Sequence, residues 1–278
     1  MQVVLWSFRR RENDVVNLYN SLTGVMQLAT GGHMLNFGYW EGADTPISAQ
    51  RRMCMLVSDM AELGSAKRLA DIGSGLSAPA LQWNDAYRQL DTSCININFS
   101  QLSYASKLMN DKNAPSLINA TATALPFSDK SVDRIIALES AQHFKPFDLF
   151  VGECRRVLAD DGLFVAAIPV MTLASKSIEI RRLGILTFTW SSERYPIEYV
   201  TSAITENGFE IKEAKRIGHQ VYEPLADYYV KNRKEIRDRI LKEYPRYLEQ
   251  VLYKSLLKMK QVSEKQIIDY LVVKCSLQ

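Results

Sequence analysis

The chain has 278 residues, of which 47% are hydrophobic, and a formal net charge of +3. This size and composition suit one large α/β domain with a complete core, and so small a charge does not indicate a nucleic-acid partner. The longest apolar runs, such as residues 162–168, have the length of a strand, so we expect no stable membrane insertion. The four cysteines are scattered without a Cys-x-x-Cys pair, which predicts no zinc site and a reducing, cytoplasmic setting.

Two helices and an aromatic segment precede the first predicted strand. Residues 10–30 have helical periodicity and meet two glycines at 31–32, and a second helix is expected at about 48–63. Between the helices, residues 33–42 are aromatic and bounded by glycine. This segment is expected to cover the core.

Residues 69–77 form an apolar strand that ends in an acid and breaks into a turn of small residues, LADIGSGLS. Gly73 and Gly75 allow the backbone to turn sharply and to approach a ligand where a Cβ atom would collide. Ser77 or Ala78 then begins a helix whose free N–H groups face that ligand. We interpret the stretch as a cradle for a nucleoside cofactor.

The position of the acid indicates which cofactor. Asp71 stands two residues before the first glycine, where its carboxylate would repel the pyrophosphate of a dinucleotide but would tolerate a cationic, zwitterionic ligand. A nicotinamide-dependent oxidoreductase would also need a third glycine and an acid about 20 residues further on. The chain has Ser77 and Asn96 at those places, so this alternative fails twice.

Strands alternate with helices from the cradle onward. Strands are expected at 68–72, 94–98, 116–119, 132–138, 163–168, 209–214 and 267–275, and helices at 79–89, 101–109, 147–158, 197–207 and, once or twice, within 223–262. The alternation predicts a doubly wound α/β fold with a mostly parallel sheet, in which ligands bind beyond the carboxyl ends of the strands.

Four motifs occur in a fixed order: DIGSGLS, CININFSQ, ATALPFSDKSVDRIIALESAQHF and ECRRVLADDGL. In this order the chain resembles the class I S-adenosylmethionine-dependent methyltransferases over roughly residues 33–275. It is most similar to the small-molecule branch that begins with a His/Phe-Gly-Tyr-Trp segment and includes tocopherol, sterol-like and natural-product methyltransferases. The resemblance implies a Rossmann-like sheet of seven strands whose last strand is antiparallel, formed by residues 209–217 and 267–275.

The resemblance also implies a single methyltransferase domain over residues 1–278. Its parts are N-terminal helices and a lid (1–64), a cofactor-binding core (65–170), a cap insertion (171–196), and C-terminal strands (197–278) that carry a helical insertion (218–264).

The cofactor residues implied by the resemblance follow the first three strands and the aromatic segment. Asp71 would lie beneath the methionine part of S-adenosylmethionine, and Asn96 and Gln101 would reach the ribose. Thr121 and Ala122 would face the adenine. The full cofactor set is Tyr39, Trp40, Asp71, Gly73, Ser74, Gly75, Asn96, Ile97, Gln101, Thr121, Ala122 and Glu139.

Two of these positions are neutral where the family usually has a carboxylate. Asn96 stands at the ribose position, where an amide can accept one hydrogen bond and donate another. Thr121 stands at the adenine position and brings no charge. Tyr39 and Trp40 would cover the cofactor or substrate because aromatic faces attract a sulfonium, although packing in the core is the alternative.

The chemistry is expected after the fourth strand. His143 is a candidate general base, or else a residue that orients or packs, and Glu139 is a second catalytic candidate that could also hold the cofactor's ammonium. Trp190, Tyr195, His219 and Tyr222 are expected to contact the substrate.

The expected function is methylation of a small, apolar or aromatic molecule on O, N or C by in-line displacement. The alternative is a catalytically inactive, methyltransferase-like binding or scaffold protein. An RNA methyltransferase would need a basic face or an Asn/Asp-Pro-Pro-aromatic motif after the fourth strand. Residues 139–142 have the sequence ESAQ instead of this motif. Association into homo-oligomers is left open.

Overall fold

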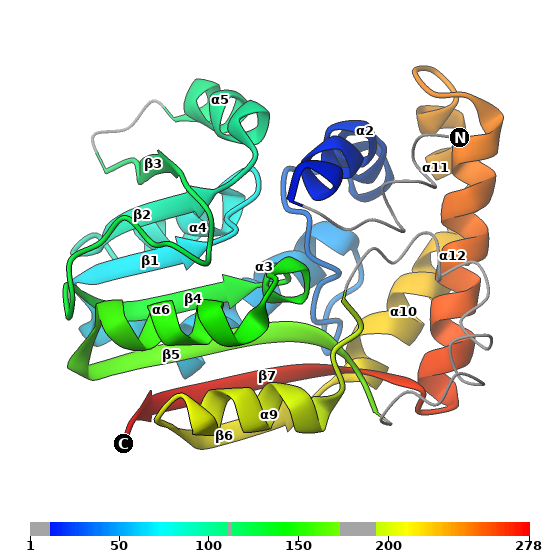
Figure 1. The fold of residues 1–278 in the computed structure, drawn as a ribbon. Helices are drawn as coiled ribbons and strands as arrows, with labels where there is room; N and C mark the ends of the chain where they lie inside the picture. Colours follow the sequence, from blue (N-terminus) through cyan, green and yellow to red (C-terminus); the bar gives the residue numbers. More distant parts are fainter. Residues whose placement is uncertain (1–11, 110–112, 173–192) are drawn as a thin grey trace.

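The computed structural model describes residues 12–109, 113–172 and 193–278. In these ranges seven strands form one sheet in the order β3-β2-β1-β4-β5-β7-β6 (Figure 1). The strands are β1 (Arg68–Ile72), β2 (Asp91–Asn96), β3 (Ser116–Asn119), β4 (Val132–Leu138), β5 (Leu158–Met171), β6 (Phe209–Arg216) and β7 (Ile268–Leu277). The last strand, β7, runs antiparallel to both of its neighbours, β5 and β6, which confirms the expected sheet.

Helices cover both faces of the sheet because the strands are apolar on both sides. Leu69 of β1 and Ile136 of β4 belong to one core cluster, whereas the adjacent Ala70 and Ile135 belong to a second cluster on the opposite face. The first cluster is closed by α3 (Pro46–Met60), α4 (Ala78–Ala86) and α10 (Gly218–Lys231), and the second by α6 (Phe147–Val157) and α9 (Ile197–Glu206). The helix α5 (Phe99–Leu108) packs beside β2 and β3.

The helical insertion is divided into more pieces than the sequence predicted. Where one or two long helices were expected, α10 is followed by α11 (Arg233–Ile240) and α12 (Arg246–Glu264). The chain breaks at Asn232 and again at Pro245, which has extended backbone angles directly before α12. Because proline has no N–H and clashes with the preceding turn, it starts a helix rather than continuing one.

The second strand also starts earlier than expected. It begins at the polar Asp91 because the register with β1 pairs Arg68 with Asp91 and continues to Ile72 and Ile95. The strand was predicted to start at Cys94 because the prediction was based on the apolar residues alone. Sheet pairing therefore extended the strand into a polar segment, and the predicted end moved back to Asn96.

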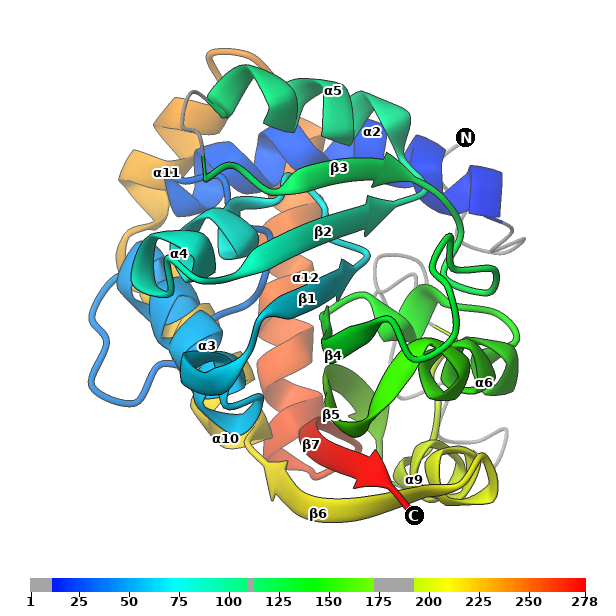
Figure 2. The ribbon, with the colours of Figure 1, turned by 90° about the vertical axis from the view of Figure 1, so that its left-hand side faces the viewer.

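Three helices stand beyond the carboxyl ends of the parallel strands. Figure 1 shows α2 (Glu12–Thr30), α11 and α12 on that side of the sheet, and in Figure 2, turned by 90°, α2 and α12 lie behind the strands. The N-terminal helix and the C-terminal insertion thus enclose the edge at which ligands bind in such sheets. Most of the expected cap at 171–196 lies outside the described residues. No helix in the described ranges is long and apolar enough to cross a membrane.

Candidate cofactor and acceptor site

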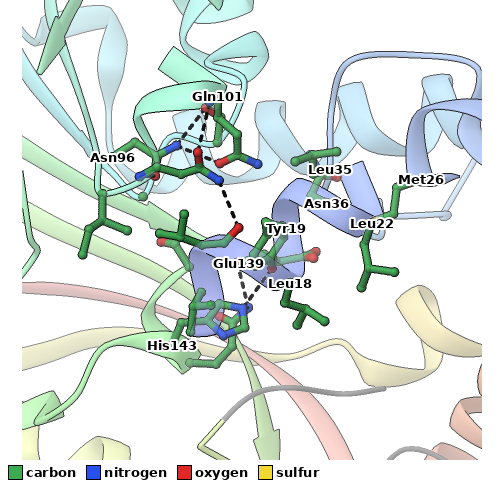
Figure 3. Close-up of a pocket in the computed structure, with 18 of the residues that line it drawn as sticks. Leu18, Tyr19, Leu22, Met26, Leu35, Asn36, Asn96, Gln101, Glu139 and His143 are labelled. Carbon is green, nitrogen blue, oxygen red and sulfur yellow. Dashed lines mark hydrogen bonds between the residues drawn. The ribbon is translucent and has the colours of Figure 1, made fainter. Parts of the chain in front are cut away.

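A cavity of about 650 Å³ lies at the carboxyl ends of β1 to β4, closed on the far side by α2 and α12. Ten residues that the sequence assigned to the site line it: Gly73, Ser74, Gly75, Asn96, Ile97, Gln101, Thr121, Ala122, Glu139 and His143. Its size falls within the roughly 300–1,000 Å³ of small-molecule pockets. Figure 3 shows Asn96 and Gln101 on one side of this cavity and His143 on the other, with Tyr19 and Glu139 between them.

The turn after β1 adopts left-handed backbone angles. Gly73 has φ +76°, and a Cβ atom there would lie 2.4 Å from the Cβ atom of Ser140. Gly75 has φ +57°, and a Cβ atom there would meet only a Leu35 methyl at 3.6 Å. Gly73 is therefore required by packing within the protein, whereas Gly75 leaves open space at the cavity wall.

The residue that precedes α4 is also left-handed. Ser77 has φ +57° and makes no capping bond to the helix; its hydroxyl instead donates to Ser74 at 3.2 Å. This position has the third glycine of the family pattern, and the left-handed angle explains why glycine suits it. The helix α4 begins at Ala78, one of the two starting residues that the sequence indicated.

Asn96 holds the turn together through its side-chain amide. Its Nδ2 atom donates to the carbonyl of Gly75 at 3.0 Å and to Oε1 of Gln101 at 2.9 Å, and its Oδ1 atom accepts from the N–H of Asn98 at 3.0 Å. A carboxylate at this position could not make the two donor bonds. The neutral residue is thus explained by the local structure.

The helix α2 contacts this end of the cavity through its own polar side chains. Asn98 donates to Asn20 at 2.9 Å, and Gln101 donates to Thr23 at 3.2 Å. Further along the sheet edge, the hydroxyl of Thr121 donates to Oε1 of Glu12 at 2.5 Å. Three residues after β2 and β3 are therefore bonded to α2.

Glu139 lies at the end of β4 between two donors. Its Oε1 atom accepts from the N–H of Phe37 at 2.8 Å and from the hydroxyl of Tyr270 at 2.9 Å. Burial raises the pKa of Glu139 to about 8 and that of Asp71, beneath the turn, to about 7. At neutral pH, without a cation beside it, Glu139 is therefore mainly protonated.

His143 is bonded to α2. Its Nε2 atom lies 2.9 Å from the hydroxyl of Tyr19 and 3.3 Å from Nε2 of Gln142 (Figure 3). Burial raises the pKa of Tyr19 well above its usual range, so its hydroxyl keeps its proton. With Tyr19 and Gln142 as donors, the Nε2 atom of His143 is an acceptor.

Six of the expected site residues do not line the cavity. Asp71 is buried under the turn, and Tyr39 bonds to Glu41. The other four are placed as follows: Trp40 packs against Tyr228, Tyr195 donates to the carbonyl of Phe144, His219 pairs with Glu223 at the surface, and Tyr222 donates to the carbonyl of Asp269. Trp190 lies outside the described residues.

The individual residues of α2 and α12 that line the cavity were not among the site residues expected from the sequence. The cavity face of α12 carries residues at helical spacing: Tyr247, Leu248, Val251, Leu252, Ser255, Leu256 and Met259. Val15, Leu18, Leu22, Val25 and Met26 line it from α2. The apolar periodicity of both helices was visible, but a pattern of this kind does not reveal whether a helix faces the core or a cavity.

Unsatisfied acceptors around Glu139 fit the ammonium group of S-adenosylmethionine. Oδ1 of Asn36 and Oε1 of Gln142 are buried without a hydrogen-bond partner among the described residues, and both side chains line the cavity beside Glu139. An ammonium has three hydrogens to donate and would satisfy such acceptors. Together with the open cradle at Gly75, these residues fit the cofactor. No group of His, Cys, Asp and Glu in the described ranges is suited to hold a metal ion.

The chain is similar to known methyltransferases in sequence and to solved structures in fold. A family described as a methyltransferase domain matches residues 70–166. The chain is 24% identical to erythromycin 3''-O-methyltransferase of Saccharopolyspora erythraea, over 82% of this chain and 78% of that one. Among solved structures, the [4+2]-cyclase SpnF has a TM-score of 0.78 at 18% identity, covering 95% of this chain and 96% of its own. The cyclopropane synthase MmaA2 from Mycobacterium tuberculosis has a TM-score of 0.77 at 16% identity, covering 94% and 95%.

The sheet order and the glycine turn after β1 define a Rossmann-like methyltransferase fold. The matched domain and the methyltransferase relatives support an S-adenosylmethionine-dependent methyltransferase of class I, with S-adenosylmethionine as the methyl donor.

Replacing Gly75 by valine should abolish cofactor binding, because the side chain would stand in the cavity. We expect the Kd for S-adenosylhomocysteine, measured by calorimetry, to rise more than about 100-fold, the effect of losing several contacts at once. Gly42→Val is the matched control, since Gly42 has a similar φ of +66° but does not line the cavity. An unchanged Kd in Gly75→Val would place the cradle elsewhere.

Binding of S-adenosylhomocysteine should release a proton from Glu139. The pKa of about 8 leaves the group mainly protonated at pH 7, whereas an ammonium beside it favours the carboxylate. We expect release of about one proton at pH 7, and affinity that rises by up to about tenfold per unit from pH 6 to 8. Calorimetry in buffers of different ionisation enthalpy measures both. Glu139→Gln should remove the release; if release persisted, another group would be its source.

Proposed function

We propose that this enzyme methylates a hydroxyl group of a bulky, apolar small molecule, with His143 and Tyr19 removing the proton. The proposal rests on one observation above all: a single cavity joins the glycine turn to the apolar faces of α2 and α12. The bonded His143 and Tyr19 lie where these parts meet (Figure 3). The similarity to erythromycin 3''-O-methyltransferase supports an oxygen acceptor.

Burial of apolar surface would provide most of the acceptor's affinity. Apart from Ser255, the wall on α12 consists of apolar and aromatic side chains over about four turns, and α2 faces it with a second apolar row. An apolar acceptor gains about 25 cal/mol for each Å² it buries. A charged acceptor would lose its hydration against these walls without gaining partners, so the lining disfavours it.

When bound, S-adenosylmethionine would supply an electrophilic methyl group for the acceptor oxygen. The residues of the chain position the acceptor, exclude water and move its proton. Tyr19 stays neutral, so it can accept the acceptor's proton only while passing its own to Nε2 of His143, 2.9 Å away. His143 ends the step as the imidazolium. Catalysis by such a positioned base typically contributes about 10²–10⁴-fold in rate.

The experiment measures S-adenosylhomocysteine formed from S-adenosylmethionine with a panel of macrolide aglycones, sterols and phenols. We expect product with at least one bulky apolar alcohol or phenol. His143→Gln and Tyr19→Phe should lower kcat by about 10²–10⁴ while the Kd for S-adenosylhomocysteine changes little. Tyr104→Phe, an exposed tyrosine on α5, is the control. Unchanged kcat in both variants would refute the relay, and binding without turnover on any acceptor would favour the inactive alternative.

A polar substitution among the α12 residues that line the cavity should weaken binding of the acceptor. Leu252→Gln places a polar group in the cavity, so the KM for the apolar acceptor should rise about tenfold, the loss expected for one partly buried leucine. The Kd for S-adenosylhomocysteine should stay the same. Leu257→Gln changes an exposed leucine of the same helix and serves as the matched control. Equal KM values for the two variants would contradict an acceptor site on α12.

A further inference from the structure

We propose that Glu12 of α2 binds the nucleobase of the cofactor and selects adenine by accepting a hydrogen bond from its exocyclic amine. This inference rests on the proposed function, because it requires S-adenosylmethionine to bind in the cavity described above. It assigns to the N-terminal helix a role in reading the base.

Glu12 lies at the β3 end of the cavity, which it lines together with Thr121, Ala122 and Thr123. Its Oε1 atom accepts the hydroxyl proton of Thr121 at 2.5 Å, across 109 positions of sequence. The first turn of a helix favours a carboxylate because the free N–H groups there carry partial positive charge. The contact thus places a negative group beside the neutral Thr121.

The bond pattern makes Thr121 a poor acceptor for a ligand. Its hydrogen is donated to Glu12, and its oxygen lies 3.4 Å from the N–H of Thr123 and 3.1 Å from the Thr123 hydroxyl. A carboxylate has about four acceptor sites, so one bond from Thr121 leaves Glu12 able to accept more. Glu12 is therefore the stronger acceptor at this end.

The distribution of charge fixes which part of the cofactor lies here. Among the described residues that line the cavity, the carboxylates are Glu12 and Glu139. Glu139, with the unsatisfied oxygens of Asn36 and Gln142, suits the ammonium end. The purine then extends toward β3, and its exocyclic amine is the donor that a carboxylate would bind.

A base with a carbonyl in place of that amine should bind more weakly. The carbonyl oxygen would face the Glu12 carboxylate, so two acceptors would meet without a proton between them. Glutamine at this position could rotate its amide and donate to the carbonyl. The preference between the two bases is therefore a direct readout of the Glu12 contact.

The experiment compares the Kd values of S-adenosylhomocysteine and S-inosylhomocysteine, which carry an amine and a carbonyl at C6 and, as a consequence, an acceptor and a donor at N1. We expect the wild type to prefer the adenine compound by at least about tenfold, the difference that one charge-assisted bond makes. In Glu12→Gln the ratio should fall to about one. A wild-type protein that binds the adenine compound and a Glu12→Gln variant with an unchanged ratio would overturn the inference.

Two further variants distinguish recognition of the base by Glu12 from a general effect of α2 on ligand binding. Asn20→Ala removes the bond from Asn98 to α2, so it should weaken both ligands equally and keep the ratio. Adding Thr121→Asp to Glu12→Gln returns a carboxylate from the β3 side and should restore the preference for adenine. Failure of this rescue would count against the inference. If the wild type bound neither ligand, the cofactor site itself would be refuted, and the inference with it.

Discussion

The site depends on one constraint, the left-handed turn that joins β1 to α4. The backbone N–H groups of Gly73 and Ser74 both donate to the carbonyl of Ile95 on β2, at 2.7 and 3.1 Å. On the other side, the hydroxyl of Ser140 after β4 donates to the carbonyl of Ile72 at 2.6 Å. The turn is therefore clamped between the neighbouring strands. A cradle held in this way is preorganised, since little conformational entropy remains to be lost when a ligand binds.

The rest of the cavity is built from distant parts of the chain. The helix α2 bonds to residues that follow β2, β3 and β4, and α12 comes from the insertion between β6 and β7. Both helices lie beyond the carboxyl ends of the parallel strands, where they line the same cavity. In the proposed site, cofactor and acceptor would both contact α2, whose polar side chains bond to residues after β2, β3 and β4 while its apolar side chains line the cavity together with α12. A change in the position of α2 would affect both ligands together.

The sheet and the cradle could be predicted from the sequence because their signals are local. A run of apolar residues indicates a strand, and glycines at two specific positions indicate a sharp turn. The contacts of α2 could not be predicted in this way, because Glu12 and its partner Thr121 are 109 positions apart in the sequence. The aromatic segment illustrates the same limit. Gly38 approaches Ala49 so closely that a Cβ atom would lie 2.7 Å from the alanine Cβ. Phe37, just before this contact, lines the cavity, whereas Tyr39 and Trp40 do not.

The neutral residues at the ends of β2 and β3 do not imply a lost cofactor site. Asn96 donates to the carbonyl of Gly75, so a carboxylate at that position would repel the oxygen that the amide now binds. The amide therefore supports the turn that the cofactor needs. After β3, Thr121 is neutral, but its hydroxyl donates a hydrogen bond to the carboxylate of Glu12. Negative charge thus remains at that edge, contributed by a helix instead of a strand end. This rearrangement keeps the electrostatic features that a zwitterionic nucleoside cofactor requires, and it favours an active enzyme over a scaffold that has lost its ligand.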